Sequence, residues 1–255
     1  MATLVPLIGL ATAGGLCIGS FLNVVAHRLP AGASLVSPGS ACPGCGAAIR
    51  PYDNVPVISW LALRGRCRAC DTRISPRYPL TEAATGALFV AVVLATRAHT
   101  QVWLDLCFVT ALVAITRIDL EHRIIPNRIL IALAALALVL TGIFTPGELP
   151  SRLIAAGAGG GLLLAAALAY PGGMGMGDVK LAAAMGLVLG PALGPALLVA
   201  LLSGSLVGVA IIARRGVAAG RKTAIPFGPF LALGGLVGLF VGQAIVNGYL
   251  RAVGL

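Results

Sequence analysis

Charged side chains are scarce in this chain: they make up 10% of its 255 residues, whereas 58% are hydrophobic. So few charges cannot cover the apolar surface of a water-soluble globule of this size, which excludes a soluble enzyme or binding domain. The apolar residues are gathered in long runs. This pattern predicts an all-α polytopic membrane protein.

Eight apolar segments follow one another along the chain, so we expect about eight transmembrane helices. They lie at residues 4–26, 80–96, 102–118, 129–144, 153–170, 179–189, 196–213 and 227–249. The segment 179–189 is the shortest, and the turn-forming sequence GPALGP follows it directly. We therefore expect this segment either to enter the membrane from one side only or to cross it where the surrounding protein is thin.

One polar stretch is long enough to form a separate small domain, and it divides the chain into three parts. Residues 1–26 are expected to be a retained first transmembrane helix, because the basic region of a signal peptide does not precede their apolar run. Residues 27–79 form the polar domain. Residues 80–255 carry the remaining transmembrane helices.

Acidic residues are even scarcer than basic ones: the chain has 8 Asp and Glu against 18 Lys and Arg, and a formal net charge of +10. If residues 27–79 face the cytoplasm, all the basic residues except Arg97, Arg152 and Arg251 lie on the cytoplasmic side. The positive-inside rule therefore predicts cytoplasmic long loops and both termini outside. Because the arginines adjoin apolar segments and lack interleaved aromatics, we expect contacts with anionic membrane lipids and no nucleic-acid partner.

Four of the six cysteines form two CxxC pairs within residues 27–79: Cys42 with Cys45, and Cys67 with Cys70. Two such pairs offer four thiolates, the ligand set of a closed, structural zinc site. Two disulfides or four free thiols are the alternatives, and a cytoplasmic location disfavours disulfides. A domain of this size has a small core, so we expect zinc to supply much of its folding free energy.

Two aspartates lie at the predicted cytoplasmic boundary of the membrane, Asp119 at the end of one span and Asp178 at the start of another. Two carboxylates that meet at a partly dry boundary repel, so one keeps its proton while the other is ionised. An aspartic protease uses such a pair. The ionised carboxylate takes a proton from the attacking water, and the protonated one donates a hydrogen bond to the peptide carbonyl oxygen.

Each aspartate also has a simpler structural interpretation. Asp119 could pair with Arg117, Arg123 or Arg128 at the membrane boundary, and Asp178 could cap a helix. At the level of the whole protein, a proton-coupled transporter would also place carboxylates beside a glycine-rich, broken segment. However, no inverted repeat is visible and the cysteine domain has no place in that scheme. A structural assembly platform leaves the paired acids unexplained.

Three glycines precede the second aspartate and favour the catalytic interpretation. Gly173, Gly175 and Gly177 allow backbone conformations and close approaches that a simple helix cap does not require. We expect them to let Asp178 move toward Asp119 when a substrate helix docks.

Several segments, taken in order, resemble those of the type IV prepilin peptidases, which are membrane aspartic proteases with a GxGD motif. They are GSFLNVVAHRLP (19–30), NVPVISWLALRGRCRAC (54–70) with its neighbouring CxxC pair, ISPRYPLTEAATGALF (74–89), IDLEHRIIPN (118–127), GMGMGDVKL (173–181) and IPFGPFLALGG (225–235). The resemblance extends over nearly the whole chain.

The resemblance implies that Asp119 and Asp178 are catalytic and that the four CxxC cysteines bind zinc. The supporting motif residues would be Gly173, Gly175, Gly177 and Lys180. The implied substrates are type IV prepilins and pseudopilins, cut after a short basic leader on the cytoplasmic side of the bacterial inner membrane, usually between glycine and phenylalanine. Many family members with the cysteine domain also methylate the new amino terminus using S-adenosylmethionine, so this activity is expected here without an assigned residue.

Two positions depart from the family pattern. Arg117 places a cation two residues before Asp119, where an apolar or small residue is more common. Asn127 follows Pro126, where an acidic residue is common. Arg117 would act on the charge of Asp119 if its side chain points inward.

Overall fold

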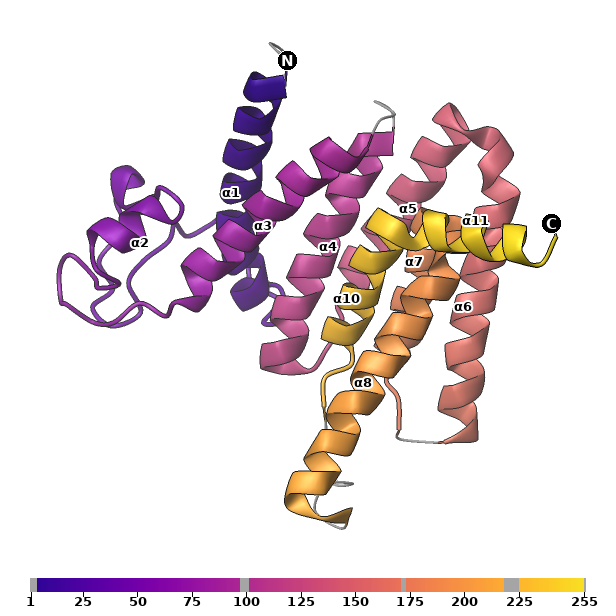
Figure 1. Ribbon diagram of the computed structural model, residues 1–255. Helices are drawn as coiled ribbons and strands as arrows, with labels where there is room; N and C mark the ends of the chain where they lie inside the picture. Colours follow the sequence, from indigo (N-terminus) through magenta and orange to yellow (C-terminus); the bar gives the residue numbers. More distant parts are fainter. Residues whose placement is uncertain (1–3, 97–100, 171–172, 218–224, 255) are drawn as a thin grey trace. The chain divides into compact units, whose positions relative to one another are not determined.

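The computed structural model describes residues 4–96, 101–170, 173–217 and 225–254. Within these residues the protein is helical, with two isolated β-bridges and no β-strand, as the all-α prediction requires (Figure 1). The chain divides into two compact units, Met1–Val102 and Trp103–Leu255. The first unit contains α1 (Leu4–Arg28), the short helices η1 (Pro51–Asn54) and α2 (Ile58–Ala62), and α3 (Arg77–Ala95).

In the first unit, α1 and α3 pack closely against each other (Figure 1). Glycine makes this possible: a Cβ atom added to Gly19 would lie 2.6 Å from the Cα atom of Glu82. One added to Gly15 would lie 2.7 Å from the Cα atom of Gly86. From Gly15 to Gly19 the residue numbers increase along α1, whereas the numbers of the residues they contact on α3 decrease, from Gly86 to Glu82. The two helices are therefore antiparallel.

The second unit consists almost entirely of helices. They are α4 (Gln101–His122, which begins just inside the first unit), α5 (Asn127–Phe144), η2 (Pro146–Glu148), α6 (Leu149–Ala169), α7 (Met176–Leu189), η3 (Gly190–Ala192), α8 (Leu193–Arg215), α10 (Gly228–Val237), η4 (Gly238–Gly242) and α11 (Gln243–Ala252). The segment η4 is a π-helical turn that joins α10 to α11 without a break.

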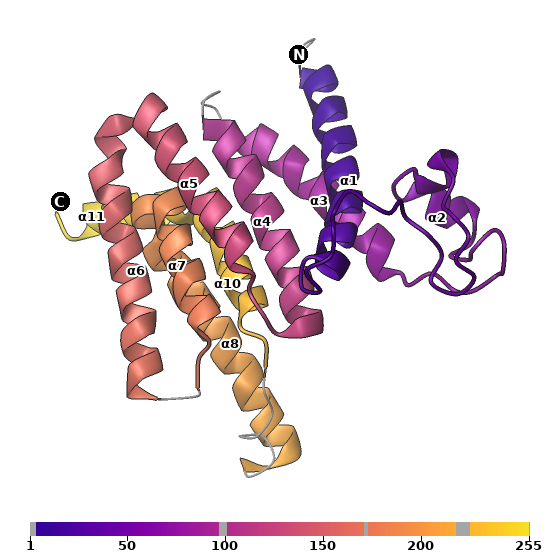
Figure 2. The ribbon, with the colours of Figure 1, turned by 180° about the vertical axis from the view of Figure 1, so that it is seen from behind.

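Helix α7 lies in the interior of the second unit, where it contacts α5, α6, α8 and α10 (Figures 1 and 2). Its side chains Leu181, Ala182 and Met185 are fully buried. A Cβ atom at Gly186 would lie 2.5 Å from the Cα atom of Ala156, so α6 and α7 are in close backbone contact there. A helix that is apolar on all sides fits such a buried position.

An arginine is buried at the carboxyl end of α7. The Arg152 side chain is only 6% exposed and its Nη1 atom donates a 2.9 Å hydrogen bond to the carbonyl oxygen of Val188. Its Nη2 atom lies 2.7 Å from Oε2 of Glu148. A cation bonded to the last carbonyls of a helix interacts favourably with the helix dipole, so Arg152 stabilises the position of α7. Arg97, which was also predicted to lie on the non-cytoplasmic side, is not among the residues that the structure describes.

Among the described residues, seven helical stretches are long and apolar enough to cross a membrane. All eight predicted segments are helical, but the structure joins two of them, 179–189 and 196–213, into one stretch of 40 residues, Met176–Arg215. The reason is that α7, η3 and α8 follow one another with no non-helical residue between them, although the chain changes direction at η3 (Figure 1). Helix α7 has 14 residues, or about 21 Å at 1.5 Å per residue, which is shorter than the roughly 30 Å of a bilayer core.

Candidate active site and metal centre

Asp119 lies in the last turn of α4, and its side chain is buried, with 5% exposed. Its Oδ2 atom accepts a 2.8 Å hydrogen bond from the backbone N–H of Gly228, the first residue of α10. A Cβ atom at Gly228 would lie 2.7 Å from that same oxygen. Residue 228 therefore has to be glycine for the amino end of α10 to approach the carboxylate this closely.

Asp178 lies in the first turn of α7 and is 9% exposed. Its Oδ2 atom accepts a 3.3 Å hydrogen bond from the N–H of Gly175, and its own N–H donates to the carbonyl oxygen of Gly175 at 3.1 Å. This is the carboxylate half of a capping box, so the cap interpretation of Asp178 is correct in geometry. The capping hydrogen bond occupies Oδ2 and leaves Oδ1 of Asp178 available. Asp178 can therefore cap α7 and still act as an acid or a base.

The two aspartates lie within electrostatic range of each other although α4 and α7 are separate in the chain. The charge of Asp119 acts on the carboxyl group of Asp178. Among the described residues, no ion pair involves Asp119; of its predicted partners, Arg123 interacts with it electrostatically. Two buried carboxyl groups in electrostatic contact are the arrangement in which a pair shares one proton.

Arg117, the unusual cation near Asp119, is neutralised by another residue. Its Nη2 atom lies 2.9 Å from Oε1 of Glu121, one turn further along α4. The expectation that Arg117 acts directly on Asp119 is therefore not supported by the contacts of its side chain. The second departure has a partner too, because Lys180 donates a 3.1 Å hydrogen bond from Nζ to Oδ1 of Asn127. This contact joins the start of α7 to the start of α5.

The three motif glycines are explained by close approach. Cβ atoms at Gly173, Gly175 and Gly177 would lie 2.4 Å from Tyr170, 3.2 Å from Asp178 Oδ2 and 3.0 Å from Ile125, respectively. None of the three has a positive φ angle, so unusual backbone conformation is not what requires them. Gly177 already lies inside α7, so the flexible approach to Asp178 is shorter than the sequence suggests.

The four CxxC cysteines form a cluster in which all the Sγ atoms lie within 4.8 Å of one another. Cys42 Sγ and Cys70 Sγ are 3.8 Å apart, which matches the separation of about 3.8 Å between ligands of a tetrahedral ion with Zn–S bonds of about 2.3 Å. A disulfide needs about 2.05 Å, and all four cysteines are free. The disulfide alternative is therefore wrong, and the ligand set fits zinc.

Each CxxC pair forms a turn of the same design. Backbone N–H groups of Gly44 and Ala69 point at Cys42 Sγ and Cys67 Sγ, both at 3.4 Å. The two isolated bridges close the turns, one pairing Ala41 with Ala48 and the other Arg66 with Arg73. Two equivalent positions, Gly46 and Asp71, have positive φ angles of 72° and 54°. Backbone N–H groups that donate to sulfur favour thiolates, which are the metal-binding form.

The hydroxyl and the backbone of Thr72 form hydrogen bonds that lower the pKa of the Cys70 thiol to about 6. Because thiolates are the ligands of zinc, a lowered pKa favours the metal-binding form of Cys70.

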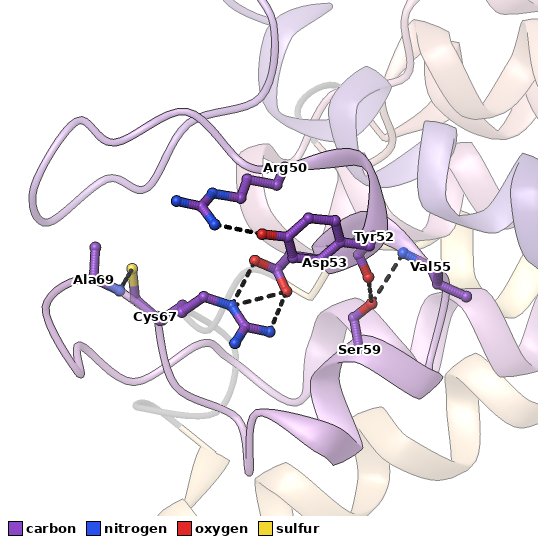
Figure 3. A network of polar contacts seen from close by, with 8 residues as sticks. Arg50, Tyr52, Asp53, Val55, Ser59, Cys67 and Ala69 are labelled. Carbon is purple, nitrogen blue, oxygen red and sulfur yellow. Dashed lines mark hydrogen bonds and ion pairs between the residues drawn. The ribbon is translucent and has the colours of Figure 1, made fainter.

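A polar network connects the second CxxC turn to the helical segment before it (Figure 3). Arg68 donates from Nε and Nη2 to the two oxygens of Asp53, at 2.9 and 2.7 Å. The hydrogen bonds from Arg68 hold the pKa of the Asp53 carboxyl below its usual value. The hydroxyl of Ser59 donates to the carbonyl of Tyr52 and accepts the N–H of Val55. The metal turn and the segment 51–62 are thus one folded piece.

Sequence reasoning did not single out Gly228 or Arg152. The signal for Gly228 was a Gly-Pro pair at the start of an apolar run, which marks a helix start. The signal for Arg152 was a lone cation close to the start of an apolar segment. Neither signal reveals the distant carboxylate or carbonyl groups that these residues contact.

Comparison with known proteins gives matches along most of the chain. Residues 14–96 match the bacterial peptidase A24 N-terminal domain, and residues 106–213 match the type IV leader peptidase family. A protein of Stutzerimonas stutzeri is 36% identical over 93% of this chain and 91% of its own length. One of Pseudomonas aeruginosa is 35% identical over 94% and 92%, and one of Aeromonas hydrophila is 37% identical over 92% and 91%. All three are named prepilin leader peptidase/N-methyltransferase, and no solved structure matches.

Proposed function

Because the chain belongs to the bacterial type IV leader peptidase family, we propose that Asp119 and Asp178 are the carboxylates with which it removes the leader from type IV prepilins. The protein is a membrane aspartic endopeptidase that is also an N-methyltransferase. The transporter alternative has no support among its relatives. The observation that carries the residue assignment is the electrostatic contact between two buried carboxyl groups from α4 and α7.

The chemistry follows from the one proton that the pair shares. The ionised carboxylate accepts a proton from water as the water attacks the scissile carbonyl carbon, and the protonated partner donates a hydrogen bond to the carbonyl oxygen. The N–H of Gly228 fixes one oxygen of Asp119, and the N–H of Gly175 fixes one oxygen of Asp178. The second oxygen of each carboxyl group is left for water and substrate.

The orientation and the wider substrate range belong to the same proposal. The protein is a multi-pass inner-membrane protein, and its Lys and Arg distribution supports an active site that faces the cytoplasm. Pseudopilins would be substrates together with prepilins. The functional parts are residues 1–26 as the first transmembrane helix, 27–79 as a cytoplasmic zinc-binding domain and 80–255 as the transmembrane peptidase core.

The cofactors have separate roles. Zinc at the four cysteines would be structural, since all four tetrahedral positions would be occupied by protein sulfur. S-adenosylmethionine would supply the methyl group for the new amino terminus, and we assign no residue to its binding. Anionic lipids would surround the basic loops.

The aspartate assignment predicts that Asp119→Asn and Asp178→Asn each abolish leader cleavage, by on the order of 10⁴-fold or more, because either change removes half of an acid–base pair. The measurement is leader loss from a purified prepilin incubated with the enzyme in detergent, followed by gel electrophoresis. Glu121→Gln is the matched control, since it removes an acid of the same helix that pairs with Arg117. Cleavage at the wild-type rate by either Asn variant would refute the assignment.

A further inference from the structure

The contact between α1 and α3 contains a buried acceptor without a partner. The side chain of Asn23 is 6% exposed, and its Nδ2 atom donates a 3.2 Å hydrogen bond to the carbonyl oxygen of Tyr78. Its Oδ1 atom is buried and accepts no hydrogen bond from the described residues. Buried polar atoms are nearly always paired, so this oxygen calls for a donor that comes from outside the chain.

A buried carboxylate lies in the same helix contact. Glu82, in the second turn of α3, is 8% exposed, and its Oε2 atom accepts a 2.7 Å hydrogen bond from the N–H of Val57. Among the described residues, no ion pair involves Glu82. A carboxylate can accept several hydrogen bonds, and one buried without a cation is unfavourable, so Glu82 has capacity for a cationic donor.

The two acceptors lie about one helical turn apart along the contact between the antiparallel helices. Gly19 lies opposite Glu82, and Asn23, one turn further along α1, lies opposite Tyr78, one turn earlier along α3. Helical side chains incline toward the amino end of their own helix. In an antiparallel pair, Asn23 therefore inclines toward the level of Glu82, and Glu82 toward the level of Asn23.

The loop that meets Glu82 is held in a strained conformation. Val57 has a φ angle of 61°, and the N–H of Ile58 bonds back to the carbonyl oxygen of Pro56. This is a γ-turn with positive φ, which is rare and unfavourable for a β-branched residue. The bond from Val57 N–H to Glu82 stabilises the turn, and strain of this kind is typical of functional sites.

We propose that Asn23 Oδ1 and the Glu82 carboxylate bind the α-ammonium group of the pilin chain that leader cleavage releases. The free capacity of this pair is for accepting hydrogen bonds, and an ammonium group is a compact cation with three donors and no acceptor. Its charge would compensate the buried carboxylate. The predicted topology puts Glu82 near the cytoplasmic boundary, the depth at which cleavage creates the new amino terminus. The inference rests on the proposed function, because the N-methyltransferase activity requires a held α-amino group.

The test is a binding measurement that needs no catalysis. The full-length enzyme in detergent is titrated with a fluorescent peptide that has the mature amino-terminal sequence of a pilin, with its α-amino group either free or acetylated. We expect the wild type to bind the free peptide about tenfold more tightly, the value of one charged hydrogen bond. Glu82→Gln should bring the ratio close to one, and Asn23→Leu should lower it.

These variants separate binding from folding. The glutamine of Glu82→Gln keeps an acceptor for the N–H of Val57, and leucine keeps the volume of Asn23 while removing its unpaired oxygen. Glu121→Gln, which changes another boundary acid, should keep the wild-type ratio. The proposal is overturned if the wild type does not distinguish the two peptides, or if Glu82→Gln keeps the preference. A third result would also overturn it: Glu82→Gln weakens the binding of a lysine-containing leader peptide and leaves the binding of the mature peptide unchanged. Glu82 would then bind the leader and not the new amino terminus. Failure of the aspartate assignment would appear instead in the cleavage assay.

Discussion

Gly228 positions the Asp119 carboxylate of the proposed catalytic pair, although it has no side chain. Its N–H bonds Asp119 across 109 positions of sequence, and the space that a Cβ atom would need is filled by the carboxylate itself. Asp119 is therefore positioned by the amino end of α10, where partial positive charge favours an anion. At this position the identity of one residue decides whether the carboxylate can stay in place.

We expect Gly228→Ala to lower kcat for leader cleavage by about 10²-fold, the cost of displacing a catalytic group by about 1 Å. KM should change little, because the contact that the added Cβ atom disturbs is the one with the Asp119 carboxylate. The measurement is steady-state cleavage of a purified prepilin. Gly161→Ala is the matched control, since a Cβ atom there meets nothing within 4 Å. Equal kcat values for the two variants would contradict this role of Gly228.

At the scale of elements, the two CxxC turns and the segment 51–62 form one small folded piece with little apolar core of its own. Cys42 is the only buried hydrophobic residue between residues 29 and 76, a range that the structure describes fully. The ion pair between Arg68 and Asp53 has a half-exposed arginine and contributes modestly. A zinc ion held by the four thiolates would therefore supply most of the stability of this piece.

Removal of zinc should unfold this piece and leave the membrane helices intact. We expect the purified protein to carry one zinc per chain, to lose it to a strong chelator, and to gain protease cleavage sites only within residues 29–76. Helical circular dichroism should fall only slightly. Cys70→Ser should lose the metal, whereas Cys107→Ser, a free cysteine outside the cluster, should retain it. An unchanged proteolysis pattern after chelation would contradict a structural role for the metal.

At the scale of the whole molecule, the passage from α7 to α8 decides how many times the chain crosses the membrane. The 40-residue stretch is one continuous apolar run by composition, but the chain reverses direction after η3, so that α8 returns alongside the interior of the second unit (Figures 1 and 2). A reversal fits either of the two predictions for residues 179–189, a crossing where the protein is thin or an entry from one side only, because in both cases α8 returns to the side on which α7 begins. With the orientation that the positive-inside rule predicts, Arg214 and Arg215 at the end of α8 would then lie with the other basic residues in the cytoplasm.

Reporter fusions test this count. Alkaline phosphatase, which is active only outside the cytoplasm, should be inactive when fused after Arg215 and active when fused after Leu255. A single crossing by residues 176–215 would produce the opposite pair of activities. A fusion within residues 29–76 should be inactive in either case and serves as the control for the orientation of the cysteine domain.

Much of the fold and of the site follows from the sequence. The eight apolar segments are helical, and the four cysteines predicted from their spacing form a cluster with all sulfur atoms within 4.8 Å of one another. Both results depend on local patterns, which are readable without the tertiary fold. The role of the motif glycines was only half anticipated: they permit close packing, and none adopts a positive φ angle. Close approach depends on the neighbouring helix, which a sequence motif does not specify.

The sequence by itself determined that this is a helical membrane protein and which cysteines can share an ion, because composition and short spacings encode these properties. Only the tertiary structure decided that Asp119 bonds Gly228 and lies within electrostatic range of Asp178, that Arg152 holds the end of α7, and that Asn23 and Glu82 share one helix contact. These pairings result from the packing of helices far apart in the chain, and packing is the sum of many weak contacts that no local pattern records.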